Sequence, residues 1–496
     1  MRAGRLRPPR IGAVLWGAGD APPMNGLRFF PEPCPNREDA MLARHRRDPT
    51  YHLRFAWLSC ALVLVGCTSE RAAGPEKLFT LEVSAGPHGR VQPSEGSFAK
   101  GTTVELTATP DPDHHVEAWS GTIDDSSKAL VNRVVMDQDR SVTVTFAADY
   151  WSVSETPVIG IHTQPSWGRW KTDPFVMRTG NRLVMYFGCN DIGSTTQICR
   201  ATSDDGAAFA LDTSRPAIRV GPGGAWDDKD IETPWVLHDP DAPPAQAYKM
   251  WYAARGAAGD NRPDWTYQIG YATSPDGVRW TKYNDPRNDA DARFAESDPV
   301  LPIPAFTCSE TDCMPVPSAT LYDAWTTGEP SVVREPDGQL RLYYIGLGLD
   351  SLDSLRFEHR VALATSGDGV SWTRREVVFE ADHGSGEKTG IMCPAVTRFR
   401  GKYWLFYTMV DLPFEEFANI EQGRTGVAVS SDGSSFTRIA NNPIIGHGPP
   451  GSYYASGAFA ATPFVENNAL QVFFSGLRYE PPALFQPTIG RAWLHD

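Results

Sequence analysis

The sequence predicts an all-β fold, in which a small β-rich domain precedes a five-bladed β-propeller. Five runs along the chain begin at a proline, continue as a short apolar strand and end in a strand rich in Tyr or Phe. The residues before these prolines are Asp173, Thr233, Glu329, Cys393 and Thr462. Such a repeat cannot bury both faces alone, so its copies should stack around an axis as blades. The residue before each proline then becomes a candidate for the central pocket.

Each repeat is expected to contain four strands. The first starts at the proline, the second runs through the aromatic cluster, the third carries an Ala-Thr-Ser type motif, and the fourth follows an Asp-Gly pair. Motifs of the third strand begin at Arg200, Tyr271, Leu363 and Ala428. Because Asp and Gly tolerate positive φ, Asp-Gly predicts a two-residue hairpin with a scaffold role.

The fifth repeat lacks a fourth strand of its own. The segment from Trp151 resembles the fourth strand of the fourth repeat, which starts at Phe436. An N-terminal strand that completes the last blade would remove two exposed sheet edges. We therefore expect residues 152–159 to pair beside residues 488–494.

The N-terminus is expected to be a targeting segment. Arginines precede the apolar run 55–65, which has the length of a signal h-region, and residues 64–67 resemble a bacterial lipobox. Residues 1–66 are therefore interpreted as an N-terminal extension with a lipoprotein signal, Cys67 as the acylated residue, and 67–77 as a tether. This predicts an exported protein, lipid-anchored to the bacterial outer membrane or cell surface. The alternative is an ordinary signal peptide with an incidental cysteine.

Export permits disulfides, and two pairings are expected: Cys189–Cys199 and Cys308–Cys313. Cys393 is then left as a small buried hydrophobe or, alternatively, a reactive thiol. No CxxC or HExxH pattern occurs, and no cofactor is expected. The net charge of −14 and the pI near 5.3 argue against nucleic acid as a partner, because phosphate binding needs a basic face.

Residues 78–148 form the predicted small domain, with several segments of period-two alternation. The segments from Gly89, Gly101 and Glu117, together with the final run 136–146, resemble the divergent internalin-type B repeat of bacterial surface proteins. The resemblance implies a compact β-rich spacer or adhesion module and no chemistry. Residues 151–496 form the predicted propeller.

Aromatic residues recur in the loops expected to lead into the first strand of each blade. These residues are Trp170, Trp226, Trp325, Tyr453 and Tyr454. Flat rings beside carboxylates suit sugars, whose C–H faces stack while their hydroxyls form hydrogen bonds. A carbohydrate ligand is therefore expected. Packing within the loops is the alternative for each ring.

An Asp before the proline of the first blade and a Glu before that of the third resemble the propellers of glycoside hydrolase families 43 and 32. The resemblance implies that Asp173 is the base or nucleophile and Glu329 the general acid. Where that superfamily has a second Asp, this chain has Thr233, with Glu232 one residue earlier as the third catalytic candidate. The alternative for Asp173 and Glu329 is that they cap backbone N–H groups at the centre of the ring.

Two further features follow from the same comparison of blades. Cys393 and Thr462 occupy the equivalent positions of the fourth and fifth blades and are small enough to leave room for a ligand. Arg356 is a candidate substrate contact in the third blade. Some members of the superfamily hold calcium through a histidine, and His162 and His383 are the candidates, although no metal is expected. The functional hypotheses are a glycoside hydrolase or a noncatalytic carbohydrate-binding or adhesion lipoprotein.

Overall fold

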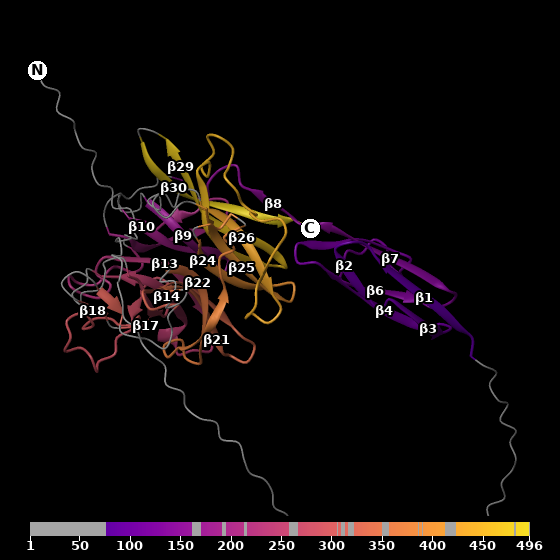
Figure 1. Ribbon diagram of the computed structural model, residues 1–496, viewed down its shortest axis with the longest axis horizontal. Coiled ribbons are helices and arrows are strands. Elements are labelled where there is room, and N and C mark those ends of the chain that lie inside the picture. Colours follow the sequence, from indigo (N-terminus) through magenta and orange to yellow (C-terminus); the bar gives the residue numbers. More distant parts are fainter. Residues whose placement is uncertain are drawn as a thin grey trace, which may run out of the picture.

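The computed structural model describes the chain in thirteen stretches (Figure 1). They are residues 76–160, 170–190, 195–212, 216–256, 266–304, 306–308, 313–315, 322–349, 357–384, 386–388, 390–411, 423–480 and 483–495. Within these stretches the regular structure is β-strand, apart from the short 3-10 helix η2 (Pro244–Gln246). No helix in the described stretches has the length and apolarity needed to cross a bilayer. The all-β prediction is confirmed.

The first described unit, residues 76–149, contains two small sheets and a core of its own. One sheet has the order β3-β1-β7-β5 and the other β2-β4-β6. Alternating strands turn residues such as Leu81, Leu106 and Val144 inward, where they are fully buried together with Trp119. The strands are β1 (Leu78–Ala85), β2 (Gly89–Gln92), β3 (Glu95–Ala99), β4 (Thr103–Pro110), β5 (His114–Ser120), β6 (Val131–Val135) and β7 (Arg140–Ala148).

The repeats fold as five antiparallel sheets, here named sheet 1 to sheet 5. Sheet 1 contains β9 (Trp170–Thr179), β10 (Arg182–Asn190), β11 (Gln197–Ser203) and β12 (Ala210–Leu211). Sheet 2 contains β13 (Asp230–His238), β14 (Tyr248–Arg255), β15 (Gln268–Ser274) and β16 (Thr281–Lys282), with β17 (Pro299–Leu301) also paired to β15. A separate hairpin joins β18 (Phe306–Cys308) to β19 (Cys313–Pro315).

Sheets 3 to 5 repeat the same strand order. Sheet 3 contains β20 (Thr326–Arg334), β21 (Leu340–Leu349), β22 (Phe357–Ser366) and β23 (Thr373–Phe379). Sheet 4 contains β24 (Gly390–Phe399), β25 (Lys402–Val410), β26 (Arg424–Ser430) and β27 (Thr437–Arg438). Sheet 5 contains β28 (Gly457–Glu466), β29 (Ala469–Glu480), β30 (Ala483–His495) and β8 (Tyr150–Val153).

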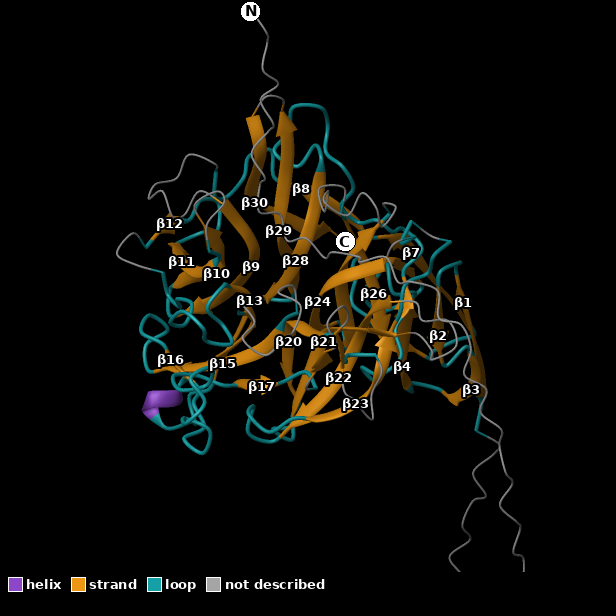
Figure 2. Cartoon of the chain, turned by 60° about the vertical axis from the view of Figure 1, so that its left-hand side comes forward, coloured by secondary structure: helices purple, strands orange, loops and turns teal. Residues whose placement is uncertain are grey.

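The first strands of the five sheets pack against one another. Each of β9, β13, β20 and β24 contacts the first strand of the next sheet, and β28 contacts β9. In Figure 2 these strands lie around the middle of the repeat region, whereas β12, β16 and β23 lie toward its outside. The residues that the repeats place before their prolines therefore lie on the innermost strands.

The expected pairing of residues 152–159 beside residues 488–494 is confirmed. Strand β8 pairs antiparallel with β30, with Ser152 opposite Trp493 and Val153 opposite Ala492. A further bridge joins Ile159 to Ile489. The two ends of the repeat region therefore share one sheet, and the edge of β30 is covered.

The Asp-Gly motifs are turns, but not two-residue hairpins. Six residues separate the third and fourth strands in sheets 1 to 4, as between Ser274 and Thr281. The Ser274 hydroxyl accepts the N–H of Gly277 at 2.8 Å, and Asp276 accepts the N–H groups of Val278 and Arg279. The glycine has a φ of 69°. Side-chain hydrogen bonds to the backbone thus stabilise a longer loop than the Asp-Gly pair alone predicts.

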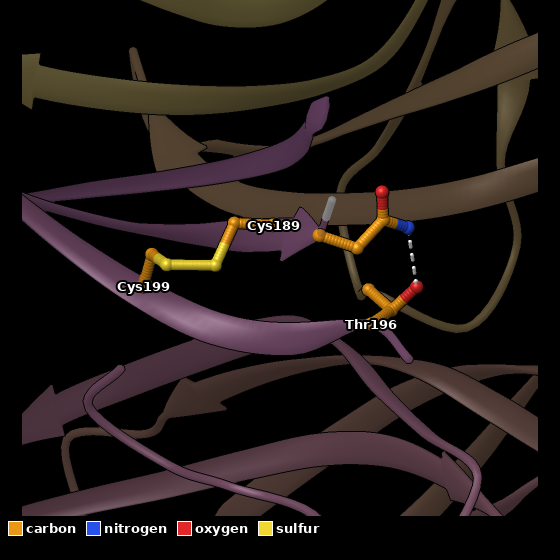
Figure 3. Close-up of a disulfide and its surroundings, with 4 residues drawn as sticks. Cys189, Thr196 and Cys199 are labelled. Carbon is orange, nitrogen blue, oxygen red and sulfur yellow. Dashed lines mark hydrogen bonds between the residues drawn. A yellow bond between two sulfur atoms is a disulfide. The ribbon is translucent and has the colours of Figure 1, made fainter. Parts of the chain in front are cut away.

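The Cys189–Cys199 disulfide is present in sheet 1, where it links β10 to β11 with a Cα–Cα distance of 5.8 Å (Figure 3). Next to it, the Asn190 amide donates to the Thr196 hydroxyl at 3.0 Å. Cys308 and Cys313 lie opposite each other in the register of β18 and β19. Their side chains lie outside the described ones, so that disulfide stays a prediction.

The first unit contacts sheet 4. The Asp149 carboxylate is almost fully buried and pairs with Arg400 at 2.6 Å and with His115 at 2.9 Å. Asn441 donates to Asp113 at 3.2 Å. Arg400 lies in the turn between β24 and β25. This turn follows the C-terminal end of the innermost strand β24, whereas the loop that leads into β24 lies at its other end.

Candidate active site

A β-bulge interrupts the first strand of every sheet. Its position shows as a register shift against the second strand, for example between Tyr186 and Gly188 in sheet 1 and between Gly328 and Ser331 in sheet 3. One non-glycine residue in each bulge has a φ between 49° and 53°. These residues are Asp173, Thr233, Glu329, Cys393 and Ala460. Such bulges re-aim a side chain away from the regular alternation of the strand.

The bulge in sheet 5 corrects one prediction. Thr462 precedes the proline, but it is paired with Phe473 in regular register, and the positive φ lies at Ala460, two residues earlier. The proline marks the bulge in sheets 1 to 4 and follows it in sheet 5. A proline indicates where the ladder lacks a donor, which does not fix where the extra residue lies. The equivalent residues are therefore Asp, Thr, Glu, Cys and Ala.

Asp173 is half-buried between fully buried neighbours. Burial raises the pKa of its carboxyl group, and a hydrogen bond from the Thr172 hydroxyl opposes that rise. Gly188 lies beside it, and a Cβ at that position would come within 3.4 Å of Asp173 Oδ2 and 3.0 Å of Thr172 Oγ1. The lack of a side chain at Gly188 therefore leaves space for the carboxylate.

Glu329 is also half-buried and is held by its neighbour in sheet 4. The Cys393 backbone N–H donates to Glu329 Oε2 at 2.5 Å, and the Cys393 thiol lies 3.6 Å from Oε1. Burial raises the pKa of Glu329 to about 7, the charge of Asp173 adds to the rise, and the Cys393 N–H lowers it. Glu329 thus caps a backbone N–H, as the alternative interpretation expected, and it also interacts with Asp173.

Glu232 lies immediately before the bulge residue of sheet 2 and is half-buried. Burial is the main reason for its raised pKa, and the charges of Asp173 and Asp230 contribute. The Arg255 guanidinium and the Tyr267 hydroxyl oppose the rise. Arg255 in turn forms a buried ion pair with Asp230 at 2.6 Å. Glu232 is therefore close enough to Asp173 for their charges to interact, although Thr233 occupies the bulge itself.

The three carboxyl groups differ in the form that each prefers. Close like charges cannot all ionise, so one group keeps a proton well above its ordinary pKa. Asp173 raises the pKa of both Glu232 and Glu329. The arrangement favours an ionised Asp173, a largely protonated Glu232, and a Glu329 that exchanges its proton near neutral pH. An acid and a base close together are what proton-transfer chemistry at a glycosidic bond requires.

The predicted aromatic contacts divide into two groups. Trp226, Trp325 and Tyr453 are buried, and packing accounts for their positions. Trp226 donates to the Ser297 hydroxyl at 3.1 Å, and the Tyr453 hydroxyl is hydrogen-bonded to that of Ser154 at 3.0 Å. Trp170 and Tyr454 are half-buried, and the Tyr454 ring also packs edge-on against Phe474. Only these two retain the exposure that stacking on a sugar needs.

Several other predicted residues can be placed only in part. Cys67, His162 and Arg356 lie outside the described residues. His383 is hydrogen-bonded to Glu358 at 2.9 Å and faces the Lys388 carbonyl oxygen at 3.2 Å. The described residues contain no group of three or more His, Cys, Asp or Glu side chains arranged to hold a metal ion.

The sequence did not indicate which residues hold the candidate carboxylates in place, and Thr462 was expected only to leave room for a ligand. Ser475 and Thr462 of sheet 5 contact the Asp173 bulge, and Tyr267 and Arg255 flank Glu232. Their signal in the sequence is weak, because hydroxyl and aromatic residues are common in strands. Only the pairing of the sheets brings them to the carboxylates.

Comparison with known proteins gives a family match within the first unit and distant similarities to other proteins. Residues 79–150 match the family described as the divergent InlB B-repeat domain. Two uncharacterized proteins from strains of Mycobacterium tuberculosis are each 24% identical to this chain over 242 residues, which is 47% of this chain. The match spans 64% of the length of each of these relatives.

Solved structures similar to this chain include several glycoside hydrolases. One described simply as a glycoside hydrolase has a TM-score of 0.48 and 16% identity, covering 69% of this chain and 92% of that protein. A family 117 glycoside hydrolase from Zobellia galactanivorans has a TM-score of 0.46 and 14% identity, covering 70% and 90%. A thermostable family-43 glycoside hydrolase has a TM-score of 0.42 and 14% identity, covering 64% and 92%. Likeness this distant says nothing about chemistry, which has to come from the residues of the site.

Proposed function

We propose that the five sheets are the blades of a five-bladed β-propeller, and that this propeller hydrolyses glycosidic bonds in a polysaccharide or oligosaccharide. The observation that carries the proposal is the electrostatic interaction between Asp173 and Glu329, which lie on the innermost strands of sheets 1 and 3. Both are half-buried, and the charge of one helps to raise the pKa of the other to about 7. Buried, electrostatically coupled carboxyl groups with raised pKa values are typical of catalytic sites.

In this proposal Glu329 is the general acid. Its protonated carboxyl donates to the departing glycosidic oxygen, while the Cys393 N–H fixes the other end of the carboxyl group and stabilises the carboxylate that forms. Asp173 is ionised and acts at the anomeric carbon, either directly or by activating water. Glu232, which holds a proton, donates a hydrogen bond to substrate or to Asp173. Trp170 and Tyr454 offer ring surface to the sugar.

The setting of this activity is part of the proposal. Residues 1–66 would direct export, Cys67 would carry the lipid, and residues 67–77 would tether the protein to the bacterial outer membrane or cell surface. The unit 78–148 would then act as a spacer between the membrane and the propeller, residues 151–496. The ion pair between Arg400 and Asp149, which His115 of this unit also contacts, supports this role, because the Arg400 turn lies at the opposite end of β24 from the loop that leads into it.

A second candidate function is noncatalytic binding of carbohydrate at the cell surface. Two observations favour it: Thr233 stands where the glycoside hydrolase pattern has a carboxylate, and one oxygen of Glu329 already accepts a backbone N–H. A binding site needs partly exposed aromatic and polar groups but no proton transfer.

The test uses the purified protein with aryl arabinosides, xylosides, fructosides, galactosides and mannosides, and with polysaccharides that contain these sugars. Release of aryl alcohol or reducing sugar by the wild type, and its loss in the Asp173→Asn/Glu329→Gln double variant, would support hydrolysis. Saturable binding to a polysaccharide without any hydrolysis, equal in both proteins, would replace hydrolysis with the binding function.

A further inference from the structure

Sheet 5 has no carboxylate at its bulge, yet two of its side chains contact the bulge of sheet 1. The Ser475 hydroxyl on β29 accepts the backbone N–H of Asp173 at 2.9 Å. The Thr462 hydroxyl on β28 donates to the carbonyl oxygen of Pro174. Ser475 and Pro174 are buried, so water does not compete readily for these bonds. The Asp173–Pro174 segment is therefore held on both sides by one neighbouring sheet.

The same hydrogen bond at another bulge provides a comparison. In sheet 5 the N–H of Ala460 donates to the Thr408 hydroxyl of β25 at 3.0 Å, in the same way as Asp173 to Ser475. Thr408 lies opposite Met392 in register, just as Ser475 lies opposite Phe459. Among the described bulges, only that of Asp173 has hydroxyl contacts at both its N–H and the following carbonyl oxygen. The doubled contact thus coincides with the carboxylate proposed to be ionised.

We propose that Ser475 and Thr462 are positioning residues for Asp173. Asp173 has a φ of 53°, which L residues adopt only under constraint from their surroundings. The direction of the Cα–Cβ bond, and with it the carboxylate, follows from that backbone conformation. Hydroxyls on both sides of the peptide hold the conformation and so aim the carboxylate at the reacting carbon. This inference rests on the proposed function, since it assigns its role through the chemistry of Asp173.

The kinetic test compares Ser475→Ala with Thr408→Val as matched control. Small displacements of a catalytic group reduce rates strongly, so Ser475→Ala should lower kcat about 10- to 100-fold with KM within roughly twofold. Ser475→Thr places the residue of sheet 4 in sheet 5 and should restore most of kcat. Thr462→Val should lower kcat about three- to tenfold. Thr408→Val removes the equivalent acceptor from Ala460 and also a hydrogen-bond partner of the Cys393 thiol, so it should lower kcat by no more than about fivefold.

The pH dependence distinguishes positioning from general loosening. Admission of water around a freed Asp173 would move its raised pKa back toward the ordinary value, so the acidic limb of the Ser475→Ala profile should shift to lower pH. The groups that face Asp173 are Thr172, Glu232, Glu329 and the Cys393 thiol. An equal loss of kcat in Thr408→Val and Ser475→Ala would overturn the proposal.

Amide hydrogen exchange separates this inference from the proposed function. Exchange in a peptide that covers residues 170–179 should be faster in Ser475→Ala than in the wild type, and unchanged in Thr408→Val. If exchange is faster in Ser475→Ala but the wild type hydrolyses no substrate, hydrolysis is rejected and the positioning role with it. The hydrogen bond between Asp173 and Ser475 would still be supported. Unchanged exchange together with normal kcat in Ser475→Ala would reject the positioning role while hydrolysis stands.

Discussion

The bulges of sheets 1 and 3 and those of sheets 4 and 5 share a backbone conformation but differ in side chain. Asp173 and Glu329 place carboxylates at the bulge, whereas Cys393 and Ala460 place a thiol and a methyl group. The φ values agree within a few degrees across all of them. A strained residue therefore arises in every sheet, whether or not it carries chemistry. Strain at Asp173 is a property of the repeat, and the case for function rests on the carboxylates and their mutual electrostatics.

The largest expected effect tests this division directly. Under the proposed function, Asp173→Asn and Glu329→Gln should each lower kcat by about 10²- to 10⁴-fold, because each removes a group assigned there to proton transfer or to attack. Ala460→Gly, which alters the same backbone position in a sheet without a carboxylate, should leave kcat within about twofold. The measurement is steady-state hydrolysis of the best aryl glycoside. A comparable loss in Ala460→Gly would show that the strained backbone itself matters.

Substitution of Glu232 should affect kcat less than substitution of Asp173 or Glu329. Burial and neighbouring negative charge raise its pKa, so near neutral pH it is largely protonated and glutamine mimics it closely. Glu232→Gln should therefore change kcat by less than about fivefold at pH 6 to 7 and should alter the pH profile only on its alkaline side. Thr233→Ser is the matched neighbour and should leave the profile unchanged. A hundredfold loss near neutral pH would instead assign Glu232 a proton-transfer role.

The stability of the fold should also reflect the cost of a buried carboxylate. The pKa of Glu329 rises from an ordinary value near 4.5 to about 7, so the folded protein binds the proton more tightly than the unfolded chain. The contribution of the protonated Glu329 to the unfolding free energy is complete below about pH 4.5 and is lost as the pH rises through about 7. Relative to Glu329→Gln, the wild type should lose up to roughly 3 kcal/mol of unfolding free energy between these pH values.

Urea unfolding of both proteins at pH 4.5 and at pH 8 measures this difference. Glu105→Gln, which removes an exposed carboxylate of the first unit that pairs with Arg133, is the control for the loss of a surface carboxylate. A constant difference between wild type and Glu329→Gln across the range would mean that Glu329 is not protonated by burial.

The smallest expected effect concerns the strain itself. Ala460→Gly relieves a conformation that costs an alanine about 1 to 2 kcal/mol, but the glycine also gains about 0.5 to 1 kcal/mol of freedom in the unfolded chain. Because Ala460 is buried, loss of its methyl group costs about a further 0.8 kcal/mol, so the unfolding free energy should stay within about 1 kcal/mol of the wild-type value. Ala458→Gly, at a fully buried position of the same strand without positive φ, relieves no strain and should lower the unfolding free energy by about 1 to 2 kcal/mol. An equal loss in both variants would show that the bulge stores little strain.

Much of the fold could be predicted from the sequence, because the same residue types recur in each repeat. Proline, aromatic cluster and Asp-Gly recur in fixed order, and these predicted the five sheets, the Cys189–Cys199 bridge and the pairing of β8 with β30. The predicted length of the Asp-Gly loops was wrong, because serine and aspartate side chains form hydrogen bonds with the backbone of a longer loop. Loop composition is a weaker constraint than strand periodicity.

The candidate site was predictable only where one residue carries the signal. Asp173 and Glu329 became candidates because each precedes a proline, and Glu232 because it precedes Thr233. The charge of Asp173 interacts with both glutamates, but their catalytic roles stay predictions. Thr462 was aligned with the wrong position, because the register of β28 against β29 places the bulge at Ala460. Trp226, Trp325 and Tyr453 fill the core, and no local pattern distinguishes such a ring from one that faces a ligand.

The pairing of β8 with β30 has a consequence for how the protein is made. Ser152 and His495 are hydrogen-bonded although 343 positions separate them in the chain. During synthesis Ser152 leaves the ribosome long before His495. Strand β8 therefore cannot pair within sheet 5 until β30 has been synthesised. Contacts this distant along the chain form slowly, because the intervening segment must first be ordered. Without β30, strand β8 would have no partner in sheet 5, so removal of residues 483–495 should destabilise both ends of the repeat region together.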